Sequence, residues 1–286
     1  KRFAREIRSD ARQALAYWNR KLEEQGIKPR SYALENRPDW FGMIETWKQQ
    51  FPLTYEKRKS EIMPPQVVEE LCRQLQGRDA VICTGVGQHQ MFTAQFYRFE
   101  EPRRFSTSGG LGSMGYGLPA AIGAHFACGG EVICMEGDGS IQMNLQELQT
   151  LLTYQIPMKL FVYNNAGYLS IKTTQKAFFG GKFMGSEESS GVVLPSFEKL
   201  AVAYGLPYFK LTNNQKLDDE LSKVFATKGP VLVEVMLDPF EVLGPKAASK
   251  KLPDGSMVSA PLEDMAPFLS REELKGNMFI PMIDQF

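Results

Sequence analysis

The fold of this chain is decided by the stretch EVICMEGDGSIQMNLQELQTLLTYQIPMKLFVYNN, residues 131 to 165. Apolar runs at 131–135 and 158–164 enclose a segment whose leucines recur at helical spacing. The first run leads into Gly-Asp-Gly, and the second leads into Asn-Asn. A strand, helix and strand of this kind form one right-handed crossover, so both strands end at the same edge of a parallel sheet. We therefore expect Asp138 and Asn165 to meet at that edge.

The same alternation continues on both sides of this stretch. Further strands are expected at 80–87 and 230–237, and helices at about 65–76, 88–97, 117–127, 195–204 and 216–227. Short apolar strands that alternate with helices indicate an α/β fold, a parallel sheet with helices on both faces. The helix inside the opening stretch is expected to begin near Asn144, which with Glu147 resembles a capping box. A long loop is expected after Asn165.

The first 62 residues have a different pattern. Apolar residues at steps of three or four predict an amphipathic helix over 3–25, with Gly26 at its C-terminal end. A connector rich in prolines and irregularly spaced aromatic residues follows, over 28–65. We therefore separate an N-terminal segment, 1–62, from an α/β domain, 63–286.

Composition excludes several classes of protein. The 33 basic residues cancel the 33 acidic ones, so no overall field attracts nucleic acid or an anionic membrane. No apolar run reaches the roughly 20 residues that span a bilayer, and the start lacks a signal-peptide core. The four cysteines form no CxxC pair and are expected to be reduced. We expect a cytoplasmic protein that binds neither nucleic acid nor membrane.

Asp138 and Asn165 lie 27 positions apart and offer one carboxylate and one carboxamide oxygen. With a backbone carbonyl they would form an oxygen-only site of low charge, which suits Mg²⁺. Gly139 allows an anion close to the backbone, and the following helix would present free N–H groups to phosphate. The joint pattern predicts a diphosphate held through Mg²⁺, although either motif alone could be a turn.

These residues resemble the thiamine diphosphate motif, in which Gly-Asp-Gly is followed by Asn-Asn; here residues 140–163 separate the two. Two further stretches, TGVGQHQMFTAQFY at 84–97 and SGGLGSMGYGLPAAIGA at 108–124, are similar to the acetolactate (acetohydroxyacid) synthase large subunit family. The resemblance covers about residues 62–240 and is weaker upstream. It implies that 1–62 is the tail of a preceding domain with a linker, and that 63–286 is the thiamine diphosphate-binding domain with a C-terminal tail.

The resemblance also implies roles for individual residues. Asp138, Asn165 and Gly167 would bind Mg²⁺, the last through its carbonyl. The diphosphate would be contacted by Gln88, His89, Gly139 and Ser140. The rings of the cofactor would be lined by Gly112, Ser113 and Met114, with Met114 supporting its bent shape, and Tyr168 is included in the cofactor-binding set.

The implied reaction is decarboxylation of pyruvate or a related 2-ketoacid, followed by carboligation to an acceptor. No catalytic residue is expected in this chain, because the activating glutamate of such enzymes comes from a pyrimidine-binding domain of the same or a partner subunit. A homodimer or homotetramer is implied. The chain alone is expected to bind the cofactor weakly and to turn over nothing.

Three alternatives stay open. Thr174 stands where the family has a tryptophan that selects the acceptor, so a decarboxylase, a lyase or a keto-sugar carboligase is possible. A non-catalytic relative with the same fold is a second alternative. The third is an NAD-dependent dehydrogenase, because Gly110, Gly112 and Gly115 spell GxGxxG and Glu136 ends the next strand. Against it, the charged segment 100–109 is not expected to form the strand that such a fingerprint needs.

Overall fold

The computed structural model describes residues 9–27, 40–100, 102–241, 244–252, 254–279 and 281–282. The chain divides into two compact units, Lys1–Tyr55 and Glu56–Phe286, and each is described by itself. The assignment of 1–62 to a preceding domain stays a prediction.

The first unit contains two helices, α1 (Ala11–Glu24) and α3 (Trp40–Gln50). Asp10 caps α1 by accepting the Gln13 N–H at 3.1 Å, and Gly26 follows its end with φ at +69°. The first residues of the predicted helix, 3–8, lie outside the described residues. The helix α3 was not expected, because its aromatic residues were interpreted as irregular. Trp40 and Trp47 in fact form an edge-to-face pair, with ring centroids 5.8 Å apart.

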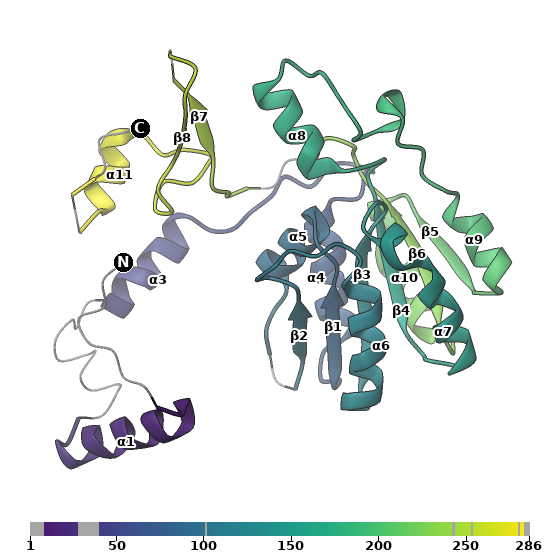
Figure 1. Ribbon diagram of the computed structural model, residues 1–286, viewed down its shortest axis with the longest axis horizontal. Helices are drawn as coiled ribbons and strands as arrows, with labels where there is room; N and C mark the ends of the chain where they lie inside the picture. The colour runs from purple at the N-terminus through teal and green to yellow at the C-terminus, as the bar shows by residue number, and fades with distance from the viewer. Residues whose placement is uncertain are drawn as a thin grey trace. The chain divides into compact units, whose positions relative to one another are not determined.

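The second unit is built on a six-stranded sheet with the order β2-β1-β3-β4-β6-β5 (Figure 1). Every neighbouring pair in it is parallel. The strands are β1 (Ala80–Thr84), β2 (Arg104–Thr107), β3 (Glu131–Gly137), β4 (Lys159–Asn164), β5 (Tyr208–Leu211) and β6 (Val231–Met236). The predicted α/β fold with a parallel sheet is confirmed.

Helices cover both faces of this sheet, and each face has its own apolar core. Ile133 and Met135 of β3 pack with α4 (Pro64–Gln74), α10 (Leu217–Ala226) and the end of α5 (Gln88–Phe96). Val132 and Cys134 of the same strand pack with α6 (Gly117–Cys128), α7 (Leu148–Thr153) and α9 (Phe197–Tyr204). Successive residues of a strand point to opposite faces, so a strand buried on both is a continuous apolar run.

The expectation that 100–109 forms no strand was wrong. Arg104–Thr107 form β2, which pairs with β1 at one edge of the sheet. An edge strand is half-exposed and therefore tolerates charge. Arg104 is exposed and forms an ion pair with Asp79 at 2.5 Å.

Two further expectations were wrong around the opening stretch. Gly-Asp-Gly leads into a 3-10 helix, η1 (Ile141–Glu147), and α7 begins at Leu148. No capping box forms, because Asn144 adopts φ −141° and its amide donates to the Gly115 carbonyl at 2.7 Å. The segment after Asn165, expected to be a loop, forms α8 (Leu169–Phe178).

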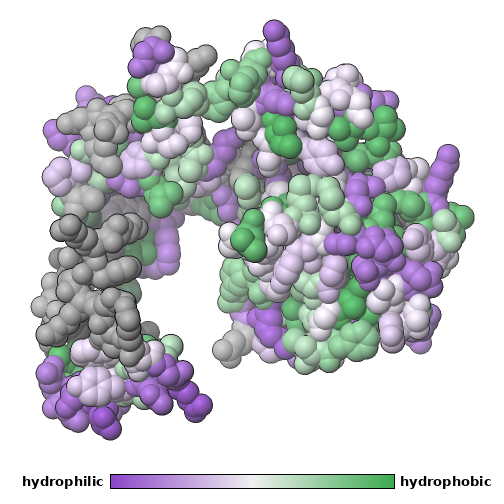
Figure 2. Space-filling view, viewed as in Figure 1, coloured by the Kyte–Doolittle hydropathy of each residue, from purple (hydrophilic) through white to green (hydrophobic). Residues whose placement is uncertain are grey.

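The remaining described elements are short: η2 (Glu188–Ser190), η3 (Asn214–Lys216), β7 (Ser249–Lys251), β8 (Met257–Ser259) and α11 (Arg271–Asn277). Within the described ranges, every helix is too short or too polar to cross a membrane. Figure 2 shows apolar residues interspersed with hydrophilic ones on one face of the molecule. Exposed aromatic residues include Phe126 of α6 and Tyr154 after α7, with ring centroids 5.5 Å apart.

Candidate functional site

Gly-Asp-Gly and Asn-Asn lie side by side at the carboxyl ends of two neighbouring strands. Gly137 of β3 is in register with Tyr163 of β4, and the Asp138 N–H donates to the Tyr163 carbonyl at 3.0 Å. The Asp138 Oδ2 accepts the N–H groups of Asn165 and Gly167, both at 3.0 Å. The two motifs are therefore bonded to each other directly.

The donor atoms at this junction suit a hard cation. The Asn165 Oδ1 is buried and has no hydrogen-bond partner. Burial raises the pKa of Asp138 to about 6, although N–H donors at Gly167, Gly139 and Asn165 lower it. An ionised Asp138 with that amide oxygen is the oxygen-rich, singly charged set that Mg²⁺ accepts. Clusters of three His, Cys, Asp or Glu side chains able to bind a metal are absent from the described residues.

The loop that joins Asn165 to α8 requires glycine at position 167. Gly167 has φ at +125°, and a Cβ there would lie 2.3 Å from the Ser186 carbonyl oxygen. The Gly167 carbonyl accepts the Leu169 N–H at 3.1 Å and keeps a second lone pair for another partner. The predicted metal set of Asp138, Asn165 and Gly167 is therefore gathered in one loop junction.

A cavity of about 320 Å³ opens beside this junction. It lies where the chain order of the sheet reverses, between β1 and β3, the place at which ligands bind in such sheets. The predicted cofactor residues that line it are Gln88, His89, Gly112, Met114, Asp138, Gly139, Ser140, Asn165, Gly167 and Tyr168. Ser113 is not among its lining residues, and its N–H donates to the Ser108 Oγ at 3.3 Å.

Several lining residues were not predicted. Val86 and Gly87 belong to the loop after β1, inside the stretch 84–97 that carried the resemblance. Leu169, Ser170 and Ile171 form the first turn of α8 and also line the cavity, together with Met91 and Gly137. Leu169, Ser170 and Ile171 were missed because this segment was expected to be a loop. The helical spacing of its sequence was the signal that could have identified them.

Tyr168 covers the backbone at Gly139. A Cβ at Gly139 would lie 2.4 Å from the Tyr168 ring, so the ring rests against this part of the loop. Thr174 lies on α8, exposed and outside the cavity lining, and its hydroxyl donates to the Ser170 carbonyl at 3.1 Å.

Two buried ionisable side chains lie at the cavity: His89 lines it, and Glu136 lies behind the lining residues. Burial lowers the pKa of His89 to about 3 and raises that of Glu136 to about 7. Glu136 is fully buried, and its Oε1 accepts the Leu118 N–H at 3.2 Å. It cannot reach a ribose hydroxyl, which a dinucleotide site would require. This burial, rather than the lack of a strand at 100–109, argues against the dehydrogenase alternative.

A buried lysine binds the loop that carries Asn165. Lys172 of α8 is fully buried, and its Nζ donates to the carbonyls of Asn165 at 2.8 Å and Ala166 at 3.3 Å. Burial lowers the pKa of Lys172, against the attraction of Asp138, which raises it. Nothing in the sequence alone indicated this role.

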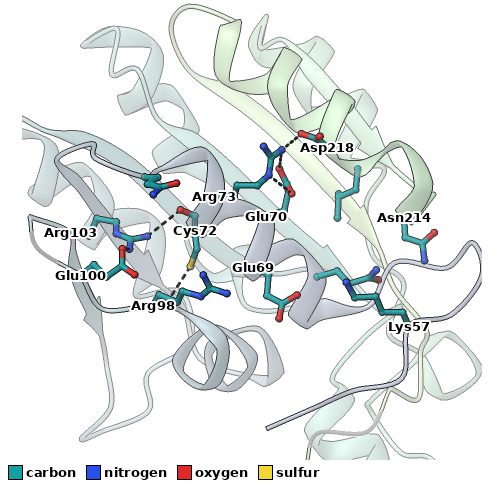
Figure 3. Close-up of a pocket in the computed structure, with 13 residues that line it drawn as sticks. Lys57, Glu69, Glu70, Cys72, Arg73, Arg98, Glu100, Arg103, Asn214 and Asp218 are labelled. Carbon is teal, nitrogen blue, oxygen red and sulfur yellow. Dashed lines mark hydrogen bonds and ion pairs between the residues drawn. The ribbon is translucent and has the colours of Figure 1, made fainter. Parts of the chain in front are cut away.

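A larger hollow of about 450 Å³ lies on α4, near residues 98–103 and the start of α10 (Figure 3). Its charged side chains neutralise one another. Arg73 forms ion pairs with Glu70 and Asp218, and Arg103 pairs with Glu100 at 2.5 Å. The smaller cavity, with its unpartnered amide oxygen, is the better candidate for a ligand site.

Residues 85–235, more than half of the chain, match the family model described as "Thiamine pyrophosphate enzyme, C-terminal TPP binding domain". The chain belongs to this thiamine pyrophosphate enzyme family. The matched range contains every residue that lines the cavity and both motifs of the opening stretch.

This thiamine pyrophosphate enzyme domain is similar to acetolactate synthases. It is 39% identical to the acetolactate synthase large subunit of Porphyra purpurea over 74% of the chain and 35% of that relative. It is 39% identical to the isozyme 3 large subunit of Escherichia coli, over 84% of the chain and 41% of the relative. For the mitochondrial catalytic subunit of Saccharomyces cerevisiae the identity is 38%, over 72% and 30%. The chain thus spans well under half the length of these relatives.

Proposed function

We propose that this chain is the cofactor-binding domain of a thiamine diphosphate- and Mg²⁺-dependent enzyme of acetolactate synthase type. The observation that carries the proposal is the direct bonding of Asp138 to the Asn165 and Gly167 N–H groups, beside a cavity into which an unpartnered amide oxygen can coordinate. Its substrate is pyruvate or a related 2-ketoacid, which is decarboxylated and joined to an acceptor.

The residues of the cavity divide by chemistry. Asp138, Asn165 and the Gly167 carbonyl hold Mg²⁺ through oxygen. The backbone around Gly139 and Ser140, with Gln88 and His89, receives the diphosphate. Gly112 and Met114 flank the rings of the cofactor, and Tyr168 lies against Gly139.

When bound, thiamine diphosphate supplies the electron sink for the loss of CO₂ from a 2-ketoacid. The chain's own residues bind and orient. Met114 and Ile171 give the cavity apolar walls, and Lys172 holds the loop that carries Asn165. The activating carboxylate comes from a pyrimidine-binding domain, in the same or a partner subunit of a cytoplasmic homodimer or homotetramer.

The placement of Thr174 favours a second group of candidate reactions. This residue stands outside the cavity and offers no large side chain for an acceptor. A decarboxylase or lyase that releases an aldehyde, or a carboligase that uses a keto-sugar, shares the same cofactor residues. Product analysis of the complete protein with pyruvate distinguishes these reactions, because the acetolactate type yields a joined product and the lyase a free aldehyde.

Titration calorimetry of the 286-residue chain tests cofactor binding. We expect weak binding of thiamine diphosphate that requires Mg²⁺, and no heat with NAD. Asp138→Asn should remove the binding, whereas Asp219→Asn, which removes the same charge on α10 outside the cavity, should leave it unchanged. Tight NAD binding without a thiamine diphosphate signal would overturn the proposal.

The isolated chain should consume no pyruvate, because among the described residues Asp138 is the only carboxylate that lines the cavity, and it is assigned to Mg²⁺. A coupled assay for CO₂ release, with thiamine diphosphate and Mg²⁺ present, measures this. Turnover by the chain alone would contradict the need for a separate pyrimidine-binding domain.

A further inference from the structure

Glu136 occupies the point beneath the cavity where three loops meet. Its Oε1 accepts the Leu118 N–H at the start of α6, at 3.2 Å. A Cβ at Gly85 would lie 2.1 Å from Oε2, and one at Gly117 would lie 2.4 Å from Oε1. The carboxyl group is therefore enclosed by the loop after β1 and by the first residues of α6, and glycine at both positions leaves the space for it.

The same carboxyl group reaches the loop after β3 through Ser140. The Ser140 hydroxyl accepts the Gly115 N–H at 3.0 Å, and it lies close enough to the Glu136 carboxyl group to lower the pKa of that group. Because the hydroxyl accepts at Gly115, its hydrogen is free to point to the Glu136 carboxyl group. Glu136 thereby connects Gly-Asp-Gly-Ser to the glycine loop before α6.

The second oxygen of Glu136 faces His89. The Glu136 Oε2 and the His89 Nε2 are 3.9 Å apart, and neither has a hydrogen-bond partner although both are buried. A buried polar atom without a partner is costly, so the pair gains by a small approach that forms a hydrogen bond. The Gly85 backbone is the competing partner for the ring.

We propose that Glu136 is a positioning residue for the anion-binding end of the cavity. It engages the Nε2 side of His89 and fixes the tautomer and orientation of the ring. The opposite edge, with Nδ1, then stays against Gly87 and Gly137, where added Cβ atoms would lie 3.2 and 2.8 Å from Nδ1. Both glycines line the cavity. The role of this edge in binding a diphosphate rests on the proposed function. The link between Glu136 and His89 does not depend on the proposed function.

Imidazole ¹⁵N spectra of the cofactor-free 286-residue chain, at one fixed pH, test the link. The chain has two histidines, so a His125→Gln variant assigns the His89 signals. We expect a single His89 tautomer whose Nε2 signal moves in Glu136→Gln, a change that keeps size and the acceptor for Leu118. Glu234→Gln, the same change at a carboxylate of β6 that is also buried, should leave His89 unmoved. Unchanged His89 signals in folded Glu136→Gln would assign Nε2 to Gly85 and overturn the proposal.

A double-mutant cycle tests whether Glu136 acts through His89. Glu136→Gln is expected to weaken binding of thiamine diphosphate with Mg²⁺ by about tenfold, the range known for residues that orient a binding side chain. In a His89→Gln background the same change should alter binding by less than about twofold. Additive losses would overturn the positioning role. If the unmodified chain binds no thiamine diphosphate, the proposed function fails, while the ¹⁵N spectra still decide the link.

Discussion

His89 makes the stability of the chain sensitive to acid. Burial lowers its pKa from 6.5 to about 3, so the folded protein keeps the ring neutral where the unfolded chain protonates it. The stability that the neutral His89 ring contributes to the folded state is fully present above pH 6.5 and is lost as the pH falls from 6.5 toward 3. Relative to His89→Gln, the free energy of unfolding should fall by roughly 3–5 kcal/mol over that window, given about 1.4 kcal/mol per pKa unit.

Urea denaturation of the two proteins at several pH values measures this difference. If the stability difference between the unmodified chain and His89→Gln stays constant between pH 6.5 and 4, the ring is protonated in the folded state. The desolvation expected from its burial would then be contradicted.

Lys172 is expected to stabilise the loop at Asn165 and Ala166 by donating to two carbonyl groups. Lys172→Met keeps the apolar stem but leaves the carbonyls of Asn165 and Ala166 without this donor. We expect a loss of about 1–3 kcal/mol in the free energy of unfolding. Lys176→Met is the matched control, because Lys176 lies on the same helix and is exposed. Equal effects of the two changes in thermal unfolding would contradict the role given to Lys172.

At the scale of single elements, α6 offers a matched pair of glycines. A Cβ at Gly117 would lie 2.4 Å from the backbone nitrogen of Gly85, whereas nothing lies within 4 Å of a Cβ at Gly123. Gly117→Ala should destabilise the chain by about 1–3 kcal/mol, because the backbone must shift. Gly123→Ala should stabilise it by about 0.5–1 kcal/mol, since alanine is the better helix former. Thermal unfolding of both variants checks the opposite signs, and a stabilising Gly117→Ala would contradict the close approach of α6 to the loop after β1.

The strands buried on both faces and their following motifs could be predicted from the sequence, because long apolar runs between glycines have few other interpretations. Elements that depend on tertiary partners could not. The strand β2 forms only because β1 supplies its hydrogen bonds, and α8 is a helix whose first turn lines the cavity. Asn144 failed as a cap because its amide is used by Gly115, a residue 29 positions away.

The candidate site divides in the same way. The meeting of Asp138 and Asn165 follows from strand order and the handedness of crossovers, both of which the sequence expresses. The contributions of Lys172 and Glu136 depend on which side chains face each other after packing, and no local spacing indicates them. Their roles are properties of the folded chain.

At the scale of the whole molecule, the second unit is expected to fold without the first. None of the residues of α1 or α3 is buried, while both apolar cores lie within Glu56–Phe286. A chain of residues 56–286 should therefore keep the thermal midpoint of the 286-residue chain. Calorimetric unfolding of both chains measures this, and a clearly lower midpoint for the shorter chain would show that the first unit contributes to its stability.

The loop at Asp138 is held in place by its own backbone hydrogen bonds. Backbone N–H groups from Gly139, Asn165 and Gly167 already fix its carboxylate. The conformational entropy of ordering this loop is therefore lost during folding and not during association. Binding of Mg²⁺ should accordingly show a small heat-capacity change, in contrast to sites that fold around their ligand. The hydrogen bonds of the folded chain alone would thus define the geometry of the Asp138 carboxylate.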